Sequence, residues 1–128
     1  MKLLVVDDQI QVAEIVARLA ALNGWSASSR ETADGIADLI RKENIHVLML
    51  DYRLGKENGI QVAEHLRQVG LNLPIIIFTG VAADVPMEKA KSLDILAVLQ
   101  KPLSVPELRR ALNQARQRVD QNAADNVR

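Results

Sequence analysis

The stretch Val47-Leu48-Met49-Leu50-Asp51 decides how this chain folds. Its apolar residues suit a short strand buried on both faces, and an ionisable residue closes the run. Three other apolar runs also end on reactive residues: Leu3–Val6 at Asp7-Asp8, Ile75–Phe78 at Thr79, and Ile95–Leu99, after Gln100, at Lys101-Pro102. In parallel strands these ends share one sheet edge, where open α/β sheets place their sites. Three carboxylates, a hydroxyl and an ammonium would meet there, a set typical of metal-dependent phosphoryl chemistry.

The bulk composition narrows the class of protein. The chain has 128 residues, enough for one domain, and it has no cysteine, which excludes disulfides and thiolate metal sites. Sixteen basic and sixteen acidic residues balance, so no basic excess predicts nucleic-acid binding. No apolar run approaches the roughly 20 residues of a membrane span, and the N-terminus becomes acidic too early for a signal peptide. We therefore expect a cytoplasmic α/β domain that binds neither membrane nor nucleic acid.

Strand-like and helix-like segments alternate along the chain. We expect strands at residues 2–7, 25–30, 45–50, 75–78 and 95–100, and helices at 10–23, 32–43, 60–69, 84–93 and 104–119. The apolar stripe of the first helix consists of Val12, Ile15, Val16, Leu19 and Leu22. Thr32 is expected to cap the second helix, and residues 53–58 are expected to form a polar loop. Ser104 and Glu107 form a capping-box pattern before the last helix.

This alternation predicts one doubly wound parallel sheet with five strands, joined by right-handed crossovers, and five helices on its two faces. No linker marks a second domain. Residues 120–128 are polar and lack periodicity, so we expect a domain over residues 1–119 followed by a frayed polar tail.

The reactive residues, taken in order, resemble those of the receiver domain of bacterial two-component response regulators. The resemblance covers about residues 2–119 and rests on the acidic pair Asp7-Asp8, on Asp51 with Gly59 eight residues later, on Thr79-Gly80 and on Lys101-Pro102. Each motif alone is weak, and their common order is specific. The resemblance implies the flavodoxin-like strand order 2-1-3-4-5. It also implies a cis Lys101-Pro102 peptide that aims the lysine.

By this resemblance Asp51 is the phosphoacceptor. A carboxylate at an open strand end can act as a nucleophile and form an aspartyl-phosphate, although an aspartate there often only caps the following loop. Thr79 matches the switch hydroxyl and Lys101 the phosphate-pairing lysine. A hydroxyl and an ammonium suit these roles because they offset charge on phosphoryl oxygens.

Asp7 and Asp8 match the metal-binding acidic pair of the family. Neighbouring carboxylates repel one another, and a hard divalent cation removes that penalty. The resemblance implies Mg²⁺ held by Asp7, Asp8, Asp51 and the backbone carbonyl of Arg53. The alternative for Asp8 is that it caps the first helix.

Two positions depart from the family pattern. Val98 stands where the family usually has a tyrosine or phenylalanine that turns on phosphorylation, which puts the readout surface of the last strand and its flanking helices in doubt. The segment Leu54-Gly55-Lys56-Glu57-Asn58 lacks the proline that is common after the phosphoacceptor strand, for which we expect only local consequences.

We therefore expect a signalling module that takes a phosphoryl group from the phosphohistidine of a sensor histidine kinase or phosphotransfer protein. It would act on a downstream protein, with a homodimer formed on phosphorylation, and its own catalysis would be limited to self-phosphorylation and slow autodephosphorylation. One alternative is a phosphatase of the haloacid dehalogenase type, which needs an acidic residue where this chain has Arg53. Another is a flavodoxin-like cofactor binder, which the acidic segment Asp7-Asp8-Gln9 disfavours.

Overall fold

The computed structural model of the chain describes residues 1–126. Its main sheet is parallel and contains β1 (Lys2–Val6), β2 (Ser26–Arg30), β3 (Val47–Asp51), β6 (Ile75–Thr79) and β7 (Ala97–Gln100). The helices are α1 (Ile10–Ala21), α2 (Ile36–Glu43), α3 (Gly59–Gln68), α4 (Met87–Ser92) and α5 (Val105–Asn126), with a 3₁₀ turn, η1, at Ala82–Asp84. The short strands β4 (Arg53–Leu54) and β5 (Glu57–Asn58) form a separate antiparallel pair.

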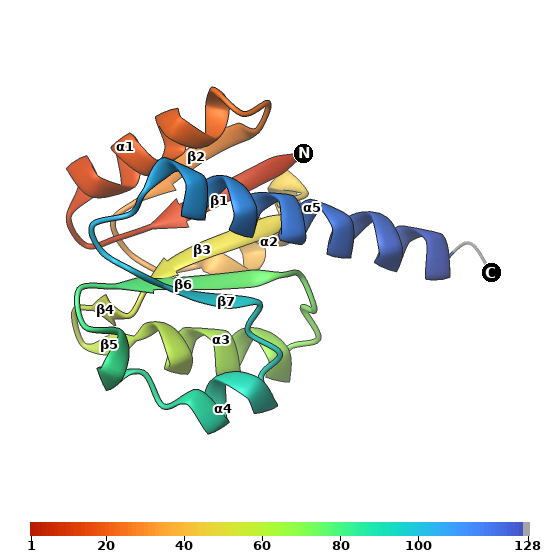
Figure 1. Cartoon of the computed structure of the whole chain (residues 1–128). Helices are drawn as coiled ribbons and strands as arrows, with labels where there is room; N and C mark the ends of the chain where they lie inside the picture. Colours follow the sequence, from red (N-terminus) through yellow and green to blue (C-terminus); the bar gives the residue numbers. More distant parts are fainter. Residues whose placement is uncertain (127–128) are drawn as a thin grey trace.

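The sheet has the order β2-β1-β3-β6-β7. Counted along its five strands, this is the order 2-1-3-4-5, so the expected doubly wound fold is confirmed. In Figure 1, α1 and α5 lie on one face of the sheet and α3 and α4 lie on the other. The carboxyl ends of β1, β3 and β6 consequently reach one common edge.

Alternate residues of the central strands feed two separate cores. Leu3 and Val5 of β1 pack with α1 and α5, whereas Leu4 and Val6 pack with α2 and α3. Successive side chains of a strand point to opposite faces, so a strand covered on both sides reads as an unbroken apolar run. All five residues of β3 and of β6 are buried. This explains why these two runs were clear in the sequence.

The predicted apolar stripe of α1 was partly wrong. The buried residues of α1 are Ala13, Val16, Ala17 and Ala20. Three alanines let the helix approach the sheet closely, and the larger apolar residues lie along its flank. Ile15 is therefore 56% exposed, and Leu22, just beyond the helix, is 83% exposed.

Three predicted helix boundaries also changed. Helix α2 begins at Ile36 instead of residue 32, because Gly35 precedes it in the left-handed conformation (φ 66°) and Thr32 caps nothing there. The expected helix at 84–93 is divided into η1 and α4, since Val85 is extended before Pro86. Helix α5 continues to Asn126.

Two segments that we expected to be irregular, residues 53–58 and residues 120–126, have regular secondary structure. Residues 120–126 continue α5 as a projecting helix (Figure 1), so a frayed tail was wrong for them, and residues 127–128 lie outside the described part. The division into a domain and a tail stays a prediction. Residues 53–58 form the β4–β5 hairpin, with Gly55 at φ 75° in the turn, instead of an open loop. Within residues 1–126, no helix is both long and apolar enough to cross a membrane.

Candidate functional site

The strand ends meet as the sequence predicts. Asp7 follows β1, Asp51 ends β3, Thr79 ends β6 and Lys101 follows β7. The Lys101 ammonium lies 2.8 Å from Oδ2 of Asp7 and 3.1 Å from Oδ2 of Asp51. One cation thus joins two carboxylates from different strands, which is the central contact of the site.

This ion-pair cluster is largely shielded from water. Asp7 is fully buried and Asp51 is only 5% exposed, while the Lys101 side chain reaches them over the ring of Phe78, with the ammonium 4.9 Å from the ring centroid. Phe78 is itself buried in the core. The ammonium therefore lies over the face of the Phe78 ring, an arrangement in which the cation and the ring attract each other.

The charges in this cluster shift each other's proton equilibria. Burial is the largest influence on the pKa of Asp51 and raises it; the Lys101 hydrogen bond lowers it, the charge of Asp7 raises it again, and the net shift is upward. Burial lowers the pKa of Lys101, but hydrogen bonds to Asp7 and Asp51 and their charges outweigh burial, and its net shift is upward. One ammonium therefore compensates the buried carboxylates incompletely.

Asp8 completes a carboxylate trio. One oxygen from each of Asp7, Asp8 and Asp51 lies within 4.8 Å of the others. Asp8 does not cap α1, because the N-cap residue is Gln9 and no side chain caps that helix end. The alternative role for Asp8 as a helix cap was therefore wrong. Its exposed carboxylate lies with those of Asp7 and Asp51 at the site.

The two buried aspartates divide their oxygens between the backbone and the site. Oδ1 of Asp7 accepts a hydrogen bond from the Gln9 N–H at 2.9 Å, and Oδ1 of Asp51 accepts one from the Arg53 N–H at 3.2 Å. Asp51 thus also serves the loop, as the alternative interpretation expected, and its Oδ2 still points at Lys101. Three clustered carboxylates fit a hard divalent cation such as Mg²⁺.

Thr79 is held against Lys101 through the backbone. It is 1% exposed, its carbonyl accepts a hydrogen bond from the Lys101 N–H at 2.7 Å, and its Oγ1 accepts one from the Val81 N–H at 3.2 Å. The Lys101-Pro102 peptide is cis, which confirms that prediction. The hydroxyl and ammonium are therefore carried on adjacent strands whose ends are bonded together.

Gly59 allows the Asp51 backbone to sit close to α3. A Cβ at residue 59 would lie 2.7 Å from the Asp51 carbonyl oxygen and 3.0 Å from the Ile77 side chain. No side chain larger than hydrogen fits there without movement of the strand end. This contact explains why a glycine is needed eight residues after Asp51.

A family model described as the response regulator receiver domain matches residues 3–113. The chain belongs to the response regulator receiver domain family. Response regulator MprA of Mycobacterium avium (strain 104) is 34% identical to this receiver domain over 110 residues, which are 84% of this chain and 47% of the relative. The receiver domain thus spans about half the length of the curated relatives it matches.

Solved structures agree on the fold. A response regulator receiver domain protein from Clostridium thermocellum has a TM-score of 0.84 at 20% identity, covering 94% of this chain and 97% of that one. A CheY-like receiver domain protein from Methanospirillum hungatei JF-1 has a TM-score of 0.80 at 18% identity, covering 97% of both chains. At these identities the likeness concerns the fold alone, and the roles of individual residues in this receiver domain remain proposals.

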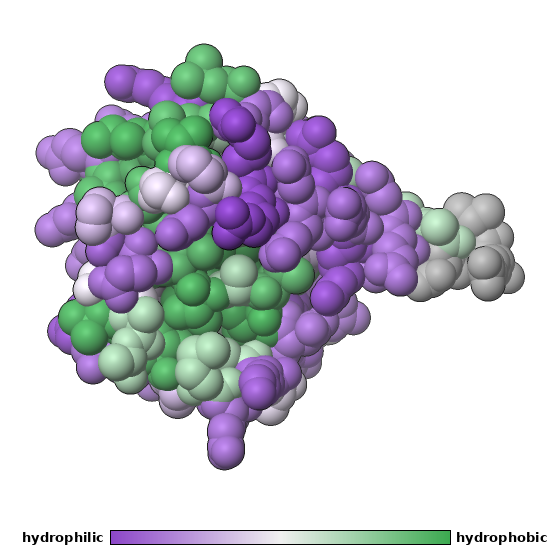
Figure 2. Space-filling view, in the orientation of Figure 1, coloured by the Kyte–Doolittle hydropathy of each residue, from purple (hydrophilic) through white to green (hydrophobic). Residues whose placement is uncertain are grey.

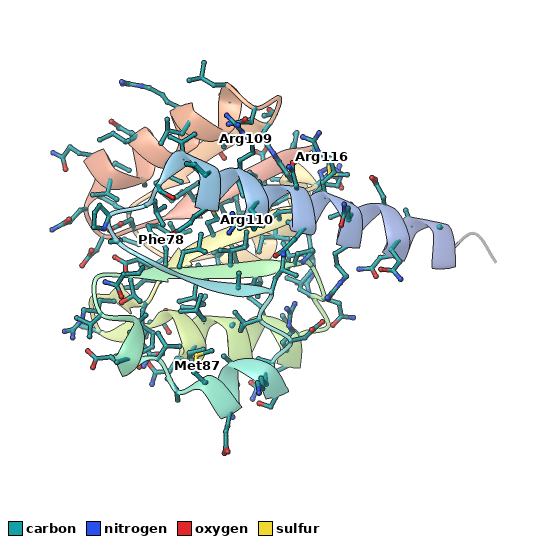
Figure 3. All side chains as sticks on the ribbon, viewed as in Figure 1. Phe78, Met87, Arg109, Arg110 and Arg116 are labelled. Carbon is teal, nitrogen blue, oxygen red and sulfur yellow. The ribbon has the colours of Figure 1, made fainter. Side chains whose placement is uncertain are left out.

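Sequence reasoning missed one polar residue of this receiver domain. The side-chain amide of Gln100, at the end of β7, bonds to the backbone on both sides of Val81 and to Lys101. The available signal was its position as the one polar residue between the last apolar run and Lys101. In the sequence alone, Gln100 reads only as an interruption of that run. Figure 3 labels Phe78 beside the sheet and Arg109, Arg110 and Arg116 along α5.

Proposed function

We propose that Asp51 accepts a phosphoryl group from a phosphohistidine on a partner protein. The observation that carries this proposal is the Lys101 ammonium placed between Asp7 and Asp51, 2.8 and 3.1 Å from their carboxylate oxygens. Such a cation neutralises charge at the point where phosphoryl oxygens would enter. The same lysine fixes Asp51 Oδ2 at the sheet edge where the strand ends meet.

The transfer makes one bond and breaks one. A carboxylate oxygen of Asp51 attacks phosphorus, the P–O bond forms, and the P–N bond to the donor imidazole breaks with its electron pair remaining on nitrogen. The imidazole then leaves as neutral histidine, with its proton balance completed by solvent. Attack by water on the aspartyl-phosphate later returns inorganic phosphate and free Asp51.

The other site residues have complementary roles in this proposal. Lys101 pairs with a phosphoryl oxygen, and the Thr79 hydroxyl donates a hydrogen bond to another. Asp7, Asp8, Asp51 and the Arg53 carbonyl would hold Mg²⁺. Bound there, the cation supplies charge neutralisation for the carboxylates and for the phosphoryl oxygens.

The donor is a protein with a histidine, such as a sensor histidine kinase or phosphotransfer protein. An apolar groove of about 460 Å³ opens beside the site, lined by Val12, Ile15, Val16, Leu19, Phe78, Lys101, Pro102 and Leu103. Because Phe78 and Lys101 line both the groove and the site, a helix seated in the groove would bring its histidine to Asp51. Ile15, which lines the groove and is exposed, is an apolar contact available to such a partner.

The output partner is a downstream protein or a second copy of this chain. Figure 2 shows apolar residues gathered between α5 and α4, over the edge strand β7. Val81, Met87 and Val105 are each at least 40% exposed, and Met87 is labelled on α4 in Figure 3. Residue 98 is a valine and is partly buried in the core under α3 and α4. This surface therefore has no aromatic side chain from that position. A cytoplasmic location stays a prediction.

A haloacid dehalogenase-like phosphatase is not favoured. That reaction needs a general acid two residues after the nucleophile, and Arg53 occupies the position. Its side chain is 71% exposed and pairs with Asp84 at 3.0 Å, so it supplies no proton to a leaving group. We therefore expect self-phosphorylation and slow autodephosphorylation, without repeated turnover of small phosphate esters.

Labelling by acetyl phosphate with Mg²⁺ tests the proposal. We expect stoichiometric, acid-labile phosphorylation of the wild type, loss of labelling in Asp51→Asn, and normal labelling in Asp38→Asn, whose side chain is 95% exposed. Full labelling of Asp51→Asn would refute the assignment. Sustained hydrolysis of a generic phosphomonoester by the wild type would favour the phosphatase instead.

A further inference from the structure

The loop that follows Thr79 is held mainly by hydrogen bonds. Gly80 is exposed, with no atom near the place a Cβ would occupy, and Val81 is 47% exposed. The loop contains a turn in which the Thr79 hydroxyl oxygen accepts from the Val81 N–H at 3.2 Å. Because packing contributes little there, its polar contacts decide where residues 80–82 lie.

Gln100, on the neighbouring strand, supplies two of these contacts and bonds to Lys101 as well. Its Oε1 accepts a hydrogen bond from the Ala82 N–H at 2.8 Å, and its Nε2 donates to the Gly80 carbonyl and, at 3.1 Å, to the Lys101 carbonyl. Gln100 pairs in register with Thr79 across the sheet. One side-chain amide thus ties both flanks of Val81 to the peptide that carries the site lysine.

A glutamine is well suited to this position. The contact needs an acceptor for one N–H and a donor for two carbonyls on the same side chain, which an amide provides and a carboxylate or an aliphatic chain does not. The amide orientation is fixed by these three partners, since the reversed orientation would place donor against donor and acceptor against acceptor.

We propose that Gln100 is a positioning residue that holds residues 80–82 in the unphosphorylated arrangement. Its bonds must loosen when Thr79 turns to a phosphoryl group on Asp51. Among the described residues the Thr79 hydroxyl has no hydrogen bond to Asp51 and is bonded within its own loop. Because the Thr79 hydroxyl oxygen accepts from the Val81 N–H, a rotation of the Thr79 side chain toward Asp51 would either break this bond or pull the turn with it, and Gln100 anchors the turn on both sides of Val81.

This role of Gln100 rests on the proposed function, and it predicts that removing the Gln100 amide raises the affinity for a phosphoryl analogue. A contact present in only one of two states favours that state, so removing it raises affinity for a ligand that binds the other. Gln100→Met keeps the length of the side chain and removes its amide. It should bind beryllofluoride, a phosphoryl analogue, with Mg²⁺ about two- to tenfold more tightly than the wild type, as expected for one net hydrogen bond.

The experiment combines calorimetric titration with amide hydrogen exchange on the full chain. Wild type, Gln100→Met and the control Gln114→Met, which alters an exposed glutamine of α5, are titrated with beryllofluoride and Mg²⁺. In the wild type, protection of the Ala82 amide should fall when beryllofluoride binds. In Gln100→Met this amide should be unprotected from the start, and Gln114→Met should match the wild type in both readouts.

The outcomes separate the two proposals. Tighter binding by Gln100→Met together with ligand-dependent exposure of the Ala82 amide supports the role of Gln100. Equal or weaker binding by Gln100→Met, or an Ala82 amide equally protected with and without beryllofluoride, overturns this role alone. No binding of beryllofluoride by the wild type overturns the proposed function, and the role of Gln100 with it.

Discussion

Replacing Lys101 with methionine isolates the contribution of the ammonium between the two buried aspartates. Methionine retains most of the aliphatic length over the Phe78 ring and loses both hydrogen bonds, at 2.8 and 3.1 Å. Removing one partner of a buried ion pair typically costs about 3–5 kcal/mol, because the remaining charge is left uncompensated. Lys101 is 22% exposed and Asp51 can take up a proton, so we expect the lower end, about 3 kcal/mol at neutral pH without Mg²⁺.

Urea unfolding of wild type and variant measures this cost, with Lys89→Met as the matched control. Lys89 pairs with Glu64, but their side chains are 48% and 39% exposed, so the control should lose less than about 1 kcal/mol. Equal losses in Lys101→Met and Lys89→Met would refute the reasoning that burial makes the Lys101 contact strong.

The pH dependence provides a second check on the same variant. The pKa of Asp51 is already raised, and loss of Lys101 removes a hydrogen bond that lowers it. The folded variant then binds a proton at Asp51 more readily than the unfolded chain does. The loss of unfolding free energy in Lys101→Met relative to the wild type should be full above the raised pKa of Asp51. This loss should shrink as the pH falls through that pKa toward the ordinary aspartate value. A deficit that is independent of pH from neutral to acidic conditions would contradict this explanation.

Three further outcomes follow from the site. Gly59→Ala should destabilise the protein by about 1–3 kcal/mol in urea unfolding, because the added Cβ would lie 2.7 Å from the Asp51 carbonyl oxygen. The control Gly80→Ala, where the added Cβ meets open space, should change stability by less than about 0.5 kcal/mol. Similar effects of the two substitutions would show that the close contact at residue 59 does not determine stability. Ile15→Arg should slow transfer from a phosphohistidine protein and leave labelling by acetyl phosphate unchanged, and equal slowing with both donors would exclude a docking role. Mg²⁺ should raise the melting temperature of the wild type more than that of Asp51→Asn, since the variant lacks one of three clustered carboxylates, and identical shifts would place the metal elsewhere.

The parallel sheet and the meeting of its strand ends could be predicted from the sequence pattern. Buried parallel strands read as continuous apolar runs, and their ends are forced to one edge by right-handed connections. Asp7, Asp51, Thr79 and Lys101 are each adjacent to such a run, so the chain's topology alone places them together. The resemblance then supplied the strand order and the cis peptide, which periodicity does not encode.

The features that escaped prediction depend on packing between elements. Helix α1 buries its alanines and exposes Ile15, because closeness to the sheet outweighed side-chain hydrophobicity, and a periodic pattern alone does not show which flank faces inward. The contacts of Gln100 join segments 18 and 20 residues apart, so no local motif signals them. Residues 120–126 are helical without an apolar stripe, as a continuation of the already formed α5.

The proposed function depends above all on Asp51 being the residue that accepts the phosphoryl group. Reduction of the acetyl phosphate-treated, Mg²⁺-containing protein with borohydride, followed by peptide mass spectrometry, locates an acyl phosphate directly at the residue that carries it. We expect modification at Asp51 and at neither Asp7 nor Asp8, because Asp51 is the proposed nucleophile whereas Asp7 and Asp8 serve only to hold the cation. Modification at Asp7 or Asp8, or an unmodified Asp51 in a fully phosphorylated sample, would contradict it.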